Sequence, residues 1–199
     1  MKAKIITVLL TATFVVGVTG QLQSVQASSP TAIAQNPQNQ SVWSLYTSPD
    51  ADFSILMPGD PEVTESSTNI DAVTVKIYGF TVKRYDDTVQ YLVTRINIPE
   101  ELNLEAVNPE QFLEAMQQQI AAQVTGEVIA SEIISLKENY PGREMTVKIA
   151  QADQTYITIN RLYWVNRKLY QVSVTVPETL EPNLTGSSTG FLNSFQLLE

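Results

Sequence analysis

The fold is decided by the stretch Tyr156–Val176, YITINRLYWVNRKLYQVSVTV. In its second half, tyrosine and valine at positions 170, 172, 174 and 176 alternate with mostly polar residues. Successive side chains of a strand point to opposite faces, so this alternation predicts a strand with one buried face. Asn166 and Arg167 divide the stretch, and asparagine tolerates the positive φ that a tight two-residue turn requires. We therefore expect a β-hairpin at the centre of an antiparallel sheet.

Shorter patterns upstream and downstream predict further strands. Apolar or alternating segments lie between turn-forming residues over 43–46, 53–57, 63–69, 72–83, 88–98, 127–136 and 145–149. The alternation changes parity at Gly79, which indicates a bulge or kink there. Turns are expected at Tyr85-Asp86-Asp87 and at Tyr140-Pro141-Gly142.

One long helix is expected over Pro109–Val124. Asn108 is a suitable N-cap, and proline is favourable at the first helical position. The apolar residues recur at helical spacing, as an amphipathic helix requires: Phe112, Leu113, Met116, Ile120 and Val124. Ser188 is expected to cap a short C-terminal helix that carries Phe191 and Phe195. The fold class is therefore α+β, an antiparallel sheet of about six to seven strands covered by one long helix and a short C-terminal helix.

The first 27 residues have the features of a secretory signal peptide. Lys2 and Lys4 precede an apolar run over 5–18, and a polar stretch then ends at Ala27, where small residues suit a signal peptidase. Ala34 offers a second cleavage point. The apolar run is short of the roughly 20 residues of a transmembrane helix, so an uncleaved anchor is the minority interpretation. No cysteine follows the run, which excludes a lipoprotein.

These features predict a domain organisation and a compartment. Residues 28–41 are polar and without periodicity, so we expect a flexible lead-in there and a single domain over 42–199. The mature protein is expected in the periplasm or the thylakoid lumen, with no transmembrane segment after cleavage.

The chain is acidic, with a formal net charge of −9, and removing Lys2 and Lys4 with the signal peptide takes this to −11. Nucleic acids and anionic membrane surfaces attract basic patches, so both are disfavoured as partners. The charge favours solubility or a basic protein partner.

The chain contains no histidine and no cysteine. Histidine-dependent serine and cysteine hydrolases, ordinary zinc sites and two-histidine iron sites are therefore excluded, and so are disulfides. No glycine-rich phosphate loop is present either. We expect no catalytic residues, no bound cofactor and no enzymatic activity.

Paired carboxylates are the remaining candidates for chemistry, and all lie in predicted turns or loops: Asp50 with Asp52, Asp86 with Asp87, and Glu100 with Glu101. A glycosidase needs two carboxyl groups that converge across a cleft, which adjacent loop acids do not indicate. Calcium takes six to eight oxygen ligands, but Asp50-Ala51-Asp52 lacks the glycine and the distal glutamate of a calcium loop. Solvated turn residues are the favoured interpretation, and calcium binding is the weaker alternative.

The predicted central hairpin carries the candidates for a protein interface. Alternation sends Tyr163 and Trp164 to opposite faces, so an exposed aromatic patch beside Arg161 and Arg167 is one interpretation. Tyrosine, tryptophan and arginine are enriched in interface hot spots. The favoured interpretation is an ordinary core, with arginine stems lying over it.

Four short patterns together resemble one family. They are, in chain order, Phe53-Ser54-Ile55-Leu56-Met57-Pro58-Gly59-Asp60-Pro61, Tyr140-Pro141-Gly142-Arg143-Glu144, Arg161-Leu162-Tyr163 and Phe191-Leu192-Asn193-Ser194-Phe195. In this order the chain looks like a PsbP/Mog1-like exported bacterial domain of the cyanobacterial type, a family named for an extrinsic subunit of photosystem II. The resemblance implies an antiparallel sheet covered by helices and an accessory or assembly role. The photosystem subunit is linked to calcium and manganese, but no matching ligand set occurs here.

The sequence therefore predicts an exported, soluble, non-catalytic accessory module that binds another protein, such as the extrinsic face of a membrane complex. The first alternative is a PsbP-like protein associated with photosystem II that binds calcium or manganese. The second is a carboxylate-dependent hydrolase, which would need two converging acids.

Overall fold

The computed structural model describes residues 41–102, 104, 107–151 and 153–198. The signal peptide and nearly all of the lead-in lie outside the described residues, so both stay predictions. The strands and helices are β1 Ser44–Thr47, β2 Phe53–Met57, β3 Glu62–Ile70, β4 Val73–Arg84, β5 Val89–Asn97, α2 Pro109–Gln123, β6 Glu127–Leu136, β7 Tyr140–Gln151, β8 Gln154–Val165, β9 Lys168–Pro177, α3 Glu181–Asn193 and β10 Gln196–Leu197.

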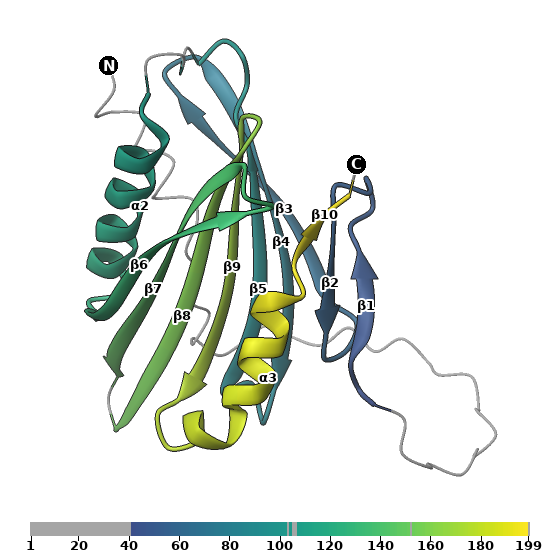
Figure 1. The fold of residues 1–199 in the computed structure, drawn as a ribbon, viewed down its shortest axis with the longest axis vertical. Helices are drawn as coiled ribbons and strands as arrows, with labels where there is room; N and C mark the ends of the chain where they lie inside the picture. The colour runs from purple at the N-terminus through teal and green to yellow at the C-terminus, as the bar shows by residue number, and fades with distance from the viewer. Residues whose placement is uncertain (1–40, 103, 105–106, 152, 199) are drawn as a thin grey trace, which may run out of the picture.

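Two antiparallel sheets organise the chain (Figure 1). The large sheet has seven strands in the order β3-β4-β5-β9-β8-β7-β6, which confirms the predicted number. The small sheet has the order β1-β2-β10 and joins the two ends of the domain, because β2 pairs with both β1 and β10. The sequence did not predict this second sheet. The α+β class is confirmed.

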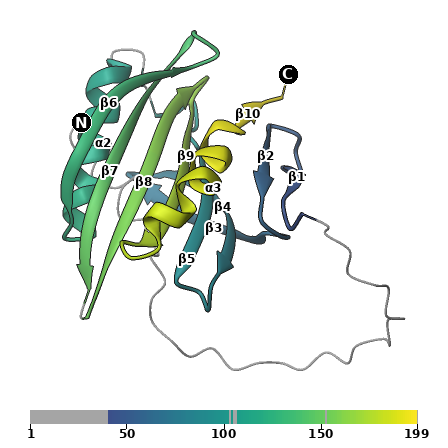
Figure 2. The same cartoon turned by 60° about the horizontal axis from the view of Figure 1, so that its bottom comes forward.

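The large sheet is covered on both faces, and each face has its own core (Figures 1 and 2). On one face, α2 packs on β7 and β8, with Leu113 and Met116 fully buried. On the other face, α3 packs on β9 and β2, and Phe53 of the small sheet lies against Phe80 and Tyr170. The sheet therefore separates two hydrophobic cores.

The hairpin β8–β9 lies at the centre, as predicted. Its turn residues, Asn166 and Arg167, have φ of 43° and 64°, which is the geometry of a tight two-residue hairpin turn. Tyr163 pairs with Tyr170 across the two strands, and both side chains belong to the core beneath α3. Tyr163 and Trp164 lie in opposite cores, which confirms the predicted alternation.

The predicted bulge at Gly79 is wrong. Gly79 pairs with Thr94 in a continuous register that runs from Lys76 to Arg84. The parity changes because β4 contributes Ile77 to the core beneath α2 and Phe80 to the core on the opposite face. The register shift in the large sheet lies between Val128 and Ala130 of β6 instead.

The helices differ from the expected long and short pair. They are similar in length, 15 residues in α2 and 13 in α3. The start of α2 is as predicted, since the Asn108 side chain accepts a hydrogen bond from the backbone N–H of Gln111. Ser188 does not cap α3: the helix starts at Glu181, with Pro182 in its first turn, and Ser188 lies buried on its inner face. Phe195 follows the helix and packs on the sheet.

The turn predicted at Tyr140-Pro141-Gly142 is also displaced. These residues begin β7, and the preceding turn contains Lys137 and Glu138, which have φ of 51° and 61°. Proline is tolerated at the start of a strand, so Pro141 does not interrupt pairing. Gly142 is required for packing rather than turning, because a Cβ there would lie 2.6 Å from Cδ1 of Tyr163.

Candidate functional site

The turn between β1 and β2 holds the first pair of candidate carboxylates, Asp50 and Asp52. Ser48 is buried in this turn, and its hydroxyl accepts hydrogen bonds from the backbone N–H groups of Asp52 and Phe53 at 3.0 and 3.2 Å. Ala51 adopts a positive φ of 54°. The turn therefore has one defined conformation, which directs both carboxylates toward the large sheet.

Both carboxylates bind Arg95, a buried arginine on β5. Its Nη1 donates to Oδ2 of Asp50 and, at 2.5 Å, to Oδ2 of Asp52. The Arg95 side chain is only 3% exposed, so its charge requires these partners. The guanidinium also lies 4.4 Å from the centre of the Tyr78 ring, a cation–π contact.

Lys168, at the start of β9, binds the same carboxylate from the other side. Its Nζ donates to both oxygens of Asp52 at 2.7 Å. Two acids and two bases thus form a balanced cluster: Asp50, Asp52, Arg95 and Lys168. The sequence alone did not predict this cluster. The available signal was Arg95, an arginine that follows Val89, Tyr91 and Val93 on one face of a predicted strand and needs an acidic partner where that face is buried.

The electrostatics of the cluster oppose acid–base catalysis. Partial burial raises the pKa of Asp50, but the hydrogen bond and the charge of Arg95 outweigh it, so this pKa lies below its ordinary value. A glycosidase acid needs a raised pKa. Asp52 has both oxygens occupied by cations. The pair is therefore suited to holding the β1–β2 turn on the sheet.

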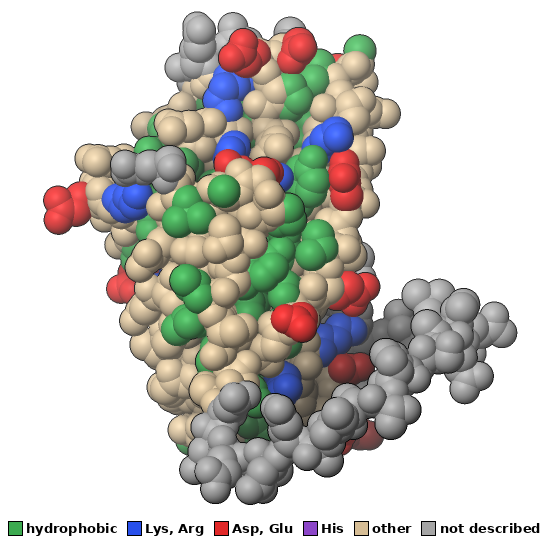
Figure 3. All heavy atoms as spheres, turned by 90° about the vertical axis from the view of Figure 1, so that its right-hand side faces the viewer, with side chains coloured by type: hydrophobic (Ala, Val, Ile, Leu, Met, Phe, Trp, Pro, Cys, Tyr) green, Lys and Arg blue, Asp and Glu red, His purple; other side chains and the backbone are tan. Residues whose placement is uncertain are grey.

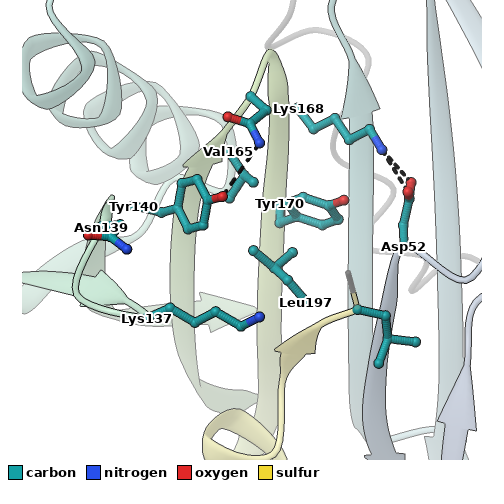
Figure 4. Close-up of a pocket in the computed structure, with 10 residues that line it drawn as sticks. Asp52, Lys137, Asn139, Tyr140, Val165, Lys168, Tyr170 and Leu197 are labelled. Carbon is teal, nitrogen blue, oxygen red and sulfur yellow. Dashed lines mark hydrogen bonds and ion pairs between the residues drawn. The ribbon is translucent and has the colours of Figure 1, made fainter.

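A polar pocket of about 270 Å³ lies beside this cluster (Figure 4). It is enclosed by the β6–β7 turn, the tip of the β8–β9 hairpin and the chain end after α3. The lining residues are Asp52, Lys137, Asn139, Tyr140, Val165, Asn166, Lys168, Tyr170, Leu197 and Leu198. Figure 4 shows Tyr140 on one side of the Tyr170 ring and the Lys168–Asp52 ion pair on the other.

The pocket offers several hydrogen-bonding groups. Burial is the main reason that the pKa of Tyr170 is raised, so its hydroxyl stays protonated. Asn166 donates to the Tyr140 hydroxyl at 3.5 Å, a long contact. Lys168 is held in its ion pair with Asp52. The pocket thus presents polar groups that can hold a small polar molecule.

The other predicted carboxylate pairs lie apart from this site. Asp86 and Asp87 are exposed in the β4–β5 turn, and Glu100 and Glu101 are exposed after β5. Within the described residues, no group of three or more acidic side chains is arranged to hold a metal ion. The acids therefore match the predicted picture of solvated turn residues, except for Asp50 and Asp52.

The structure brings Arg161 and Tyr163 together and places Trp164 and Arg167 elsewhere. Arg161 donates from Nε to Glu144 at 2.5 Å and from Nη1 to Asn193 at 2.8 Å, which ties β8 to β7 and α3. Tyr163 is 4% exposed and stacks on Phe195. Both side chains have internal partners on the α3 face of the sheet.

Trp164 and Arg167 have internal partners elsewhere. Trp164 lies edge-to-face on Phe112 of α2, with ring centres 4.9 Å apart. Arg167 donates to the carbonyl oxygens of Ile98, Pro99 and Leu102, so it fastens the hairpin tip to the segment after β5. The four residues form no common patch, and an interface role for them stays a prediction.

The most exposed apolar side chains of the large sheet lie on β6, at its edge (Figures 1 and 2). No residue of β6 is buried, and Ile129 and Ile133 are 51% and 67% exposed. The strand contains neither lysine nor proline, the residues that usually protect an edge. The described residues thus include a sheet edge that neither lysine nor proline protects, which sequence periodicity alone did not reveal.

A second apolar surface lies on the small sheet. Figure 3 shows hydrophobic side chains gathered along the middle of the face that this sheet occupies. Leu45 and Leu56 form an exposed cross-strand pair there, 66% and 37% exposed.

Comparison with known proteins gives a fold and no family. No family model matches the chain, and no curated protein sequence matches it. Among solved structures, it is similar to cyanobacterial PsbP (CyanoP) from Synechocystis sp. PCC 6803, with a TM-score of 0.55 and 9% identity over 82% of this chain and 97% of that chain. This likeness confirms a PsbP-like fold.

Two further structures are more distant. LpqN of Mycobacterium tuberculosis, described as involved in cell envelope biogenesis, has a TM-score of 0.45 and 5% identity over 79% of this chain and 91% of that chain. A putative regulator of unknown function from Pseudomonas aeruginosa, PA94, has a TM-score of 0.38 and 7% identity over 73% and 90%. Neither score is high enough to support an inference. In the described part of the chain, no helix has the length and hydropathy to cross a membrane.

Proposed function

We propose that the chain is an exported, non-catalytic accessory or assembly module that binds another protein through the outer edge of β6. The observation that carries this proposal is the exposure of Ile129 and Ile133 on an edge strand without protective residues. An edge strand offers backbone N–H and C=O groups along its free side, and an extended segment of a partner can pair with them. The proposed compartment is the periplasm or the thylakoid lumen.

The organisation of the candidate site supports a role without catalysis. Asp50 binds Arg95, and Asp52 binds both Arg95 and Lys168. The pKa of Asp50 is lowered rather than raised. A hydrolase would need one of these acids to retain a proton. The shared fold with cyanobacterial PsbP is consistent with an accessory role.

Site-specific photo-crosslinking tests the proposal. Benzoylphenylalanine replaces Ile133 on β6 or, as the control, Ser66 on β3, the exposed strand at the opposite edge. We expect a discrete crosslinked protein from position 133 only, and we expect Ile133→Asp to abolish the complex while the circular dichroism spectrum is retained. Equal crosslinking from both edges, or none from position 133, would contradict the proposal.

A PsbP-like role in which calcium or manganese binds near photosystem II is the second proposal. The PsbP-like fold favours it. Metal binding at Asp50 and Asp52, however, would have to compete with two protein cations. Saturable stabilisation by either metal would support it.

A further inference from the structure

The side chains on the two faces of β6 differ in chemistry. The inference drawn from this difference rests on the proposed function, in which β6 binds a partner protein. Cross-strand partners share a face of the sheet, so pairing assigns each β6 side chain. Ser131 pairs with Met145 of the core beneath α2, and its hydroxyl donates to Gln117 of that helix at 3.0 Å. Ile133, two residues on, therefore lies on the α2 face.

Glu132 lies on the opposite face. It pairs with Glu144, whose charge is already matched by Arg161 at 2.5 Å. No ion pair joins Glu132 to any other residue that the structure describes. The strand therefore presents an exposed isoleucine on one face and, on the other, an acid without a matching cation beside the half-buried Ile134 and Leu136.

The length available for pairing is also defined. The register shift between Val128 and Ala130 interrupts the strand, and regular pairing with β7 runs from Ala130 to Leu136. A partner strand that continues the sheet would thus align with these seven residues. Successive side chains of this partner would alternate between the Ile133 face and the Glu132 face.

We propose that β6 binds an extended, seven-residue segment of a partner protein in which aliphatic and basic residues alternate. The aliphatic side chains would pack beside Ile133, and the basic side chains would pair with Glu132. The overall acidity of the chain, −9, favours the same basic partner. A second copy of this chain is disfavoured, because β6 contains two glutamates and no basic residue.

Fluorescence anisotropy with labelled synthetic peptides tests this partner chemistry. The first peptide alternates lysine with valine, the second groups the same residues into two blocks, and the third alternates glutamate with valine. We expect the alternating basic peptide to bind at least ten-fold more tightly than either of the others. If the blocked peptide bound as tightly as the alternating basic peptide, the proposal would be overturned, because the two faces of β6 would then not select different side chains.

A charge exchange provides the decisive variant. Glu132→Lys is expected to reverse the preference so that the glutamate peptide binds more tightly, whereas the control Glu62→Lys, on the opposite edge strand β3, leaves the preference unchanged. An unchanged preference in Glu132→Lys would overturn the proposal. A dimer that is detected by light scattering and dissociated by Ile133→Asp would also overturn the proposal. The segment that pairs with β6 would then belong to a second copy of this chain.

These outcomes are separable from failure of the proposed function. A protein crosslinked through position 133 whose crosslinked segment is acidic or helical keeps β6 as the docking edge and overturns only the partner chemistry. Absence of any crosslink at position 133 overturns both.

Discussion

The ammonium group of Lys168 donates to both carboxylate oxygens of Asp52 at 2.7 Å, across 116 positions of sequence. Asp52 follows the β1–β2 turn and Lys168 begins β9, so this ion pair joins the small sheet to the centre of the large one. Arg95 binds the same carboxylate from β5. One side chain thus connects three elements that are distant in sequence.

Replacing Asp52 with asparagine should destabilise the fold. Asp52→Asn removes one of the two acidic partners of Arg95, whose side chain is 3% exposed, and leaves Lys168 without its carboxylate. Loss of one member of a buried ion pair costs several kcal/mol, and we expect a decrease of about 2–4 kcal/mol in the free energy of unfolding. Urea denaturation measures it.

Glu65→Gln is the matched control for this variant. Glu65 pairs with Lys76 on the surface, where both side chains are more than half exposed. Surface ion pairs contribute little, so we expect a change below about 1 kcal/mol. Similar losses in the two variants would show that Arg95 does not depend on Asp52.

Stability should fall at acid pH through Asp50. Its pKa is lowered in the folded protein from the ordinary 3.8, so its contribution is complete above that value and is lost as the pH falls through the lower, folded pKa. The melting temperature between pH 6 and pH 2, measured by circular dichroism, should therefore decrease less steeply in Asp50→Asn. Parallel curves for both proteins would contradict this assignment.

Gly142 should not tolerate a side chain. In Gly142→Ala the added Cβ would lie 2.6 Å from the Tyr163 ring and 2.8 Å from the carbonyl oxygen of Leu162, and backbone cannot yield as a flexible side chain can. Overpacking of this kind costs about 1–3 kcal/mol. Thermal unfolding measures the loss.

Gly186→Ala provides the comparison for Gly142. Gly186 lies within α3, and no atom lies within 4 Å of a Cβ built there. Alanine in a helix interior is more favourable than glycine by about 0.5–1 kcal/mol, so this variant should be stabilised. A stabilised Gly142→Ala would disprove the packing role.

Calcium should leave the melting temperature unchanged. Oδ2 of Asp50 and both carboxylate oxygens of Asp52 already accept from Arg95 or Lys168. A ligand that binds only the native state raises its melting temperature, so differential scanning fluorimetry with and without millimolar calcium measures binding directly. A saturable rise that Asp52→Asn removes would instead favour the metal-binding proposal.

The parts of the fold that depend on local pattern could be predicted from the sequence. The alternation over Tyr156–Val176 predicted the central hairpin, and Asn108 with Pro109 predicted the start of α2. The small sheet could not be predicted, because β10 has two residues and pairs with β2 across most of the chain. The change of apolar face at Gly79 was ambiguous in the sequence. A strand that contributes to two cores produces the same pattern as a β-bulge.

The candidate site was less accessible to sequence analysis for the same reason. Asp50 and Asp52 were recognised as a pair, but the residue that binds both, Arg95, lies more than 40 positions away. The edge of β6 depends on strand order, which no local pattern specifies. The site was therefore hard to predict because its residues lie far apart in the sequence, and not because their chemistry is unusual.

The pairing of β2 with β10 has a consequence for synthesis. Phe53 and Ser54 pair with Leu197 and Gln196, so the small sheet cannot close until the last residues of the chain have left the ribosome. The core beneath α2 draws on β3 to β5, α2 and β7 to β9 and on neither β2 nor β10, so it can assemble first. Contacts between distant residues form slowly, and a chain awaiting them exposes apolar surface. Phe53 and Ile55 remain without their final neighbours during that interval, so their apolar side chains stay exposed until Phe195 and β10 are in place.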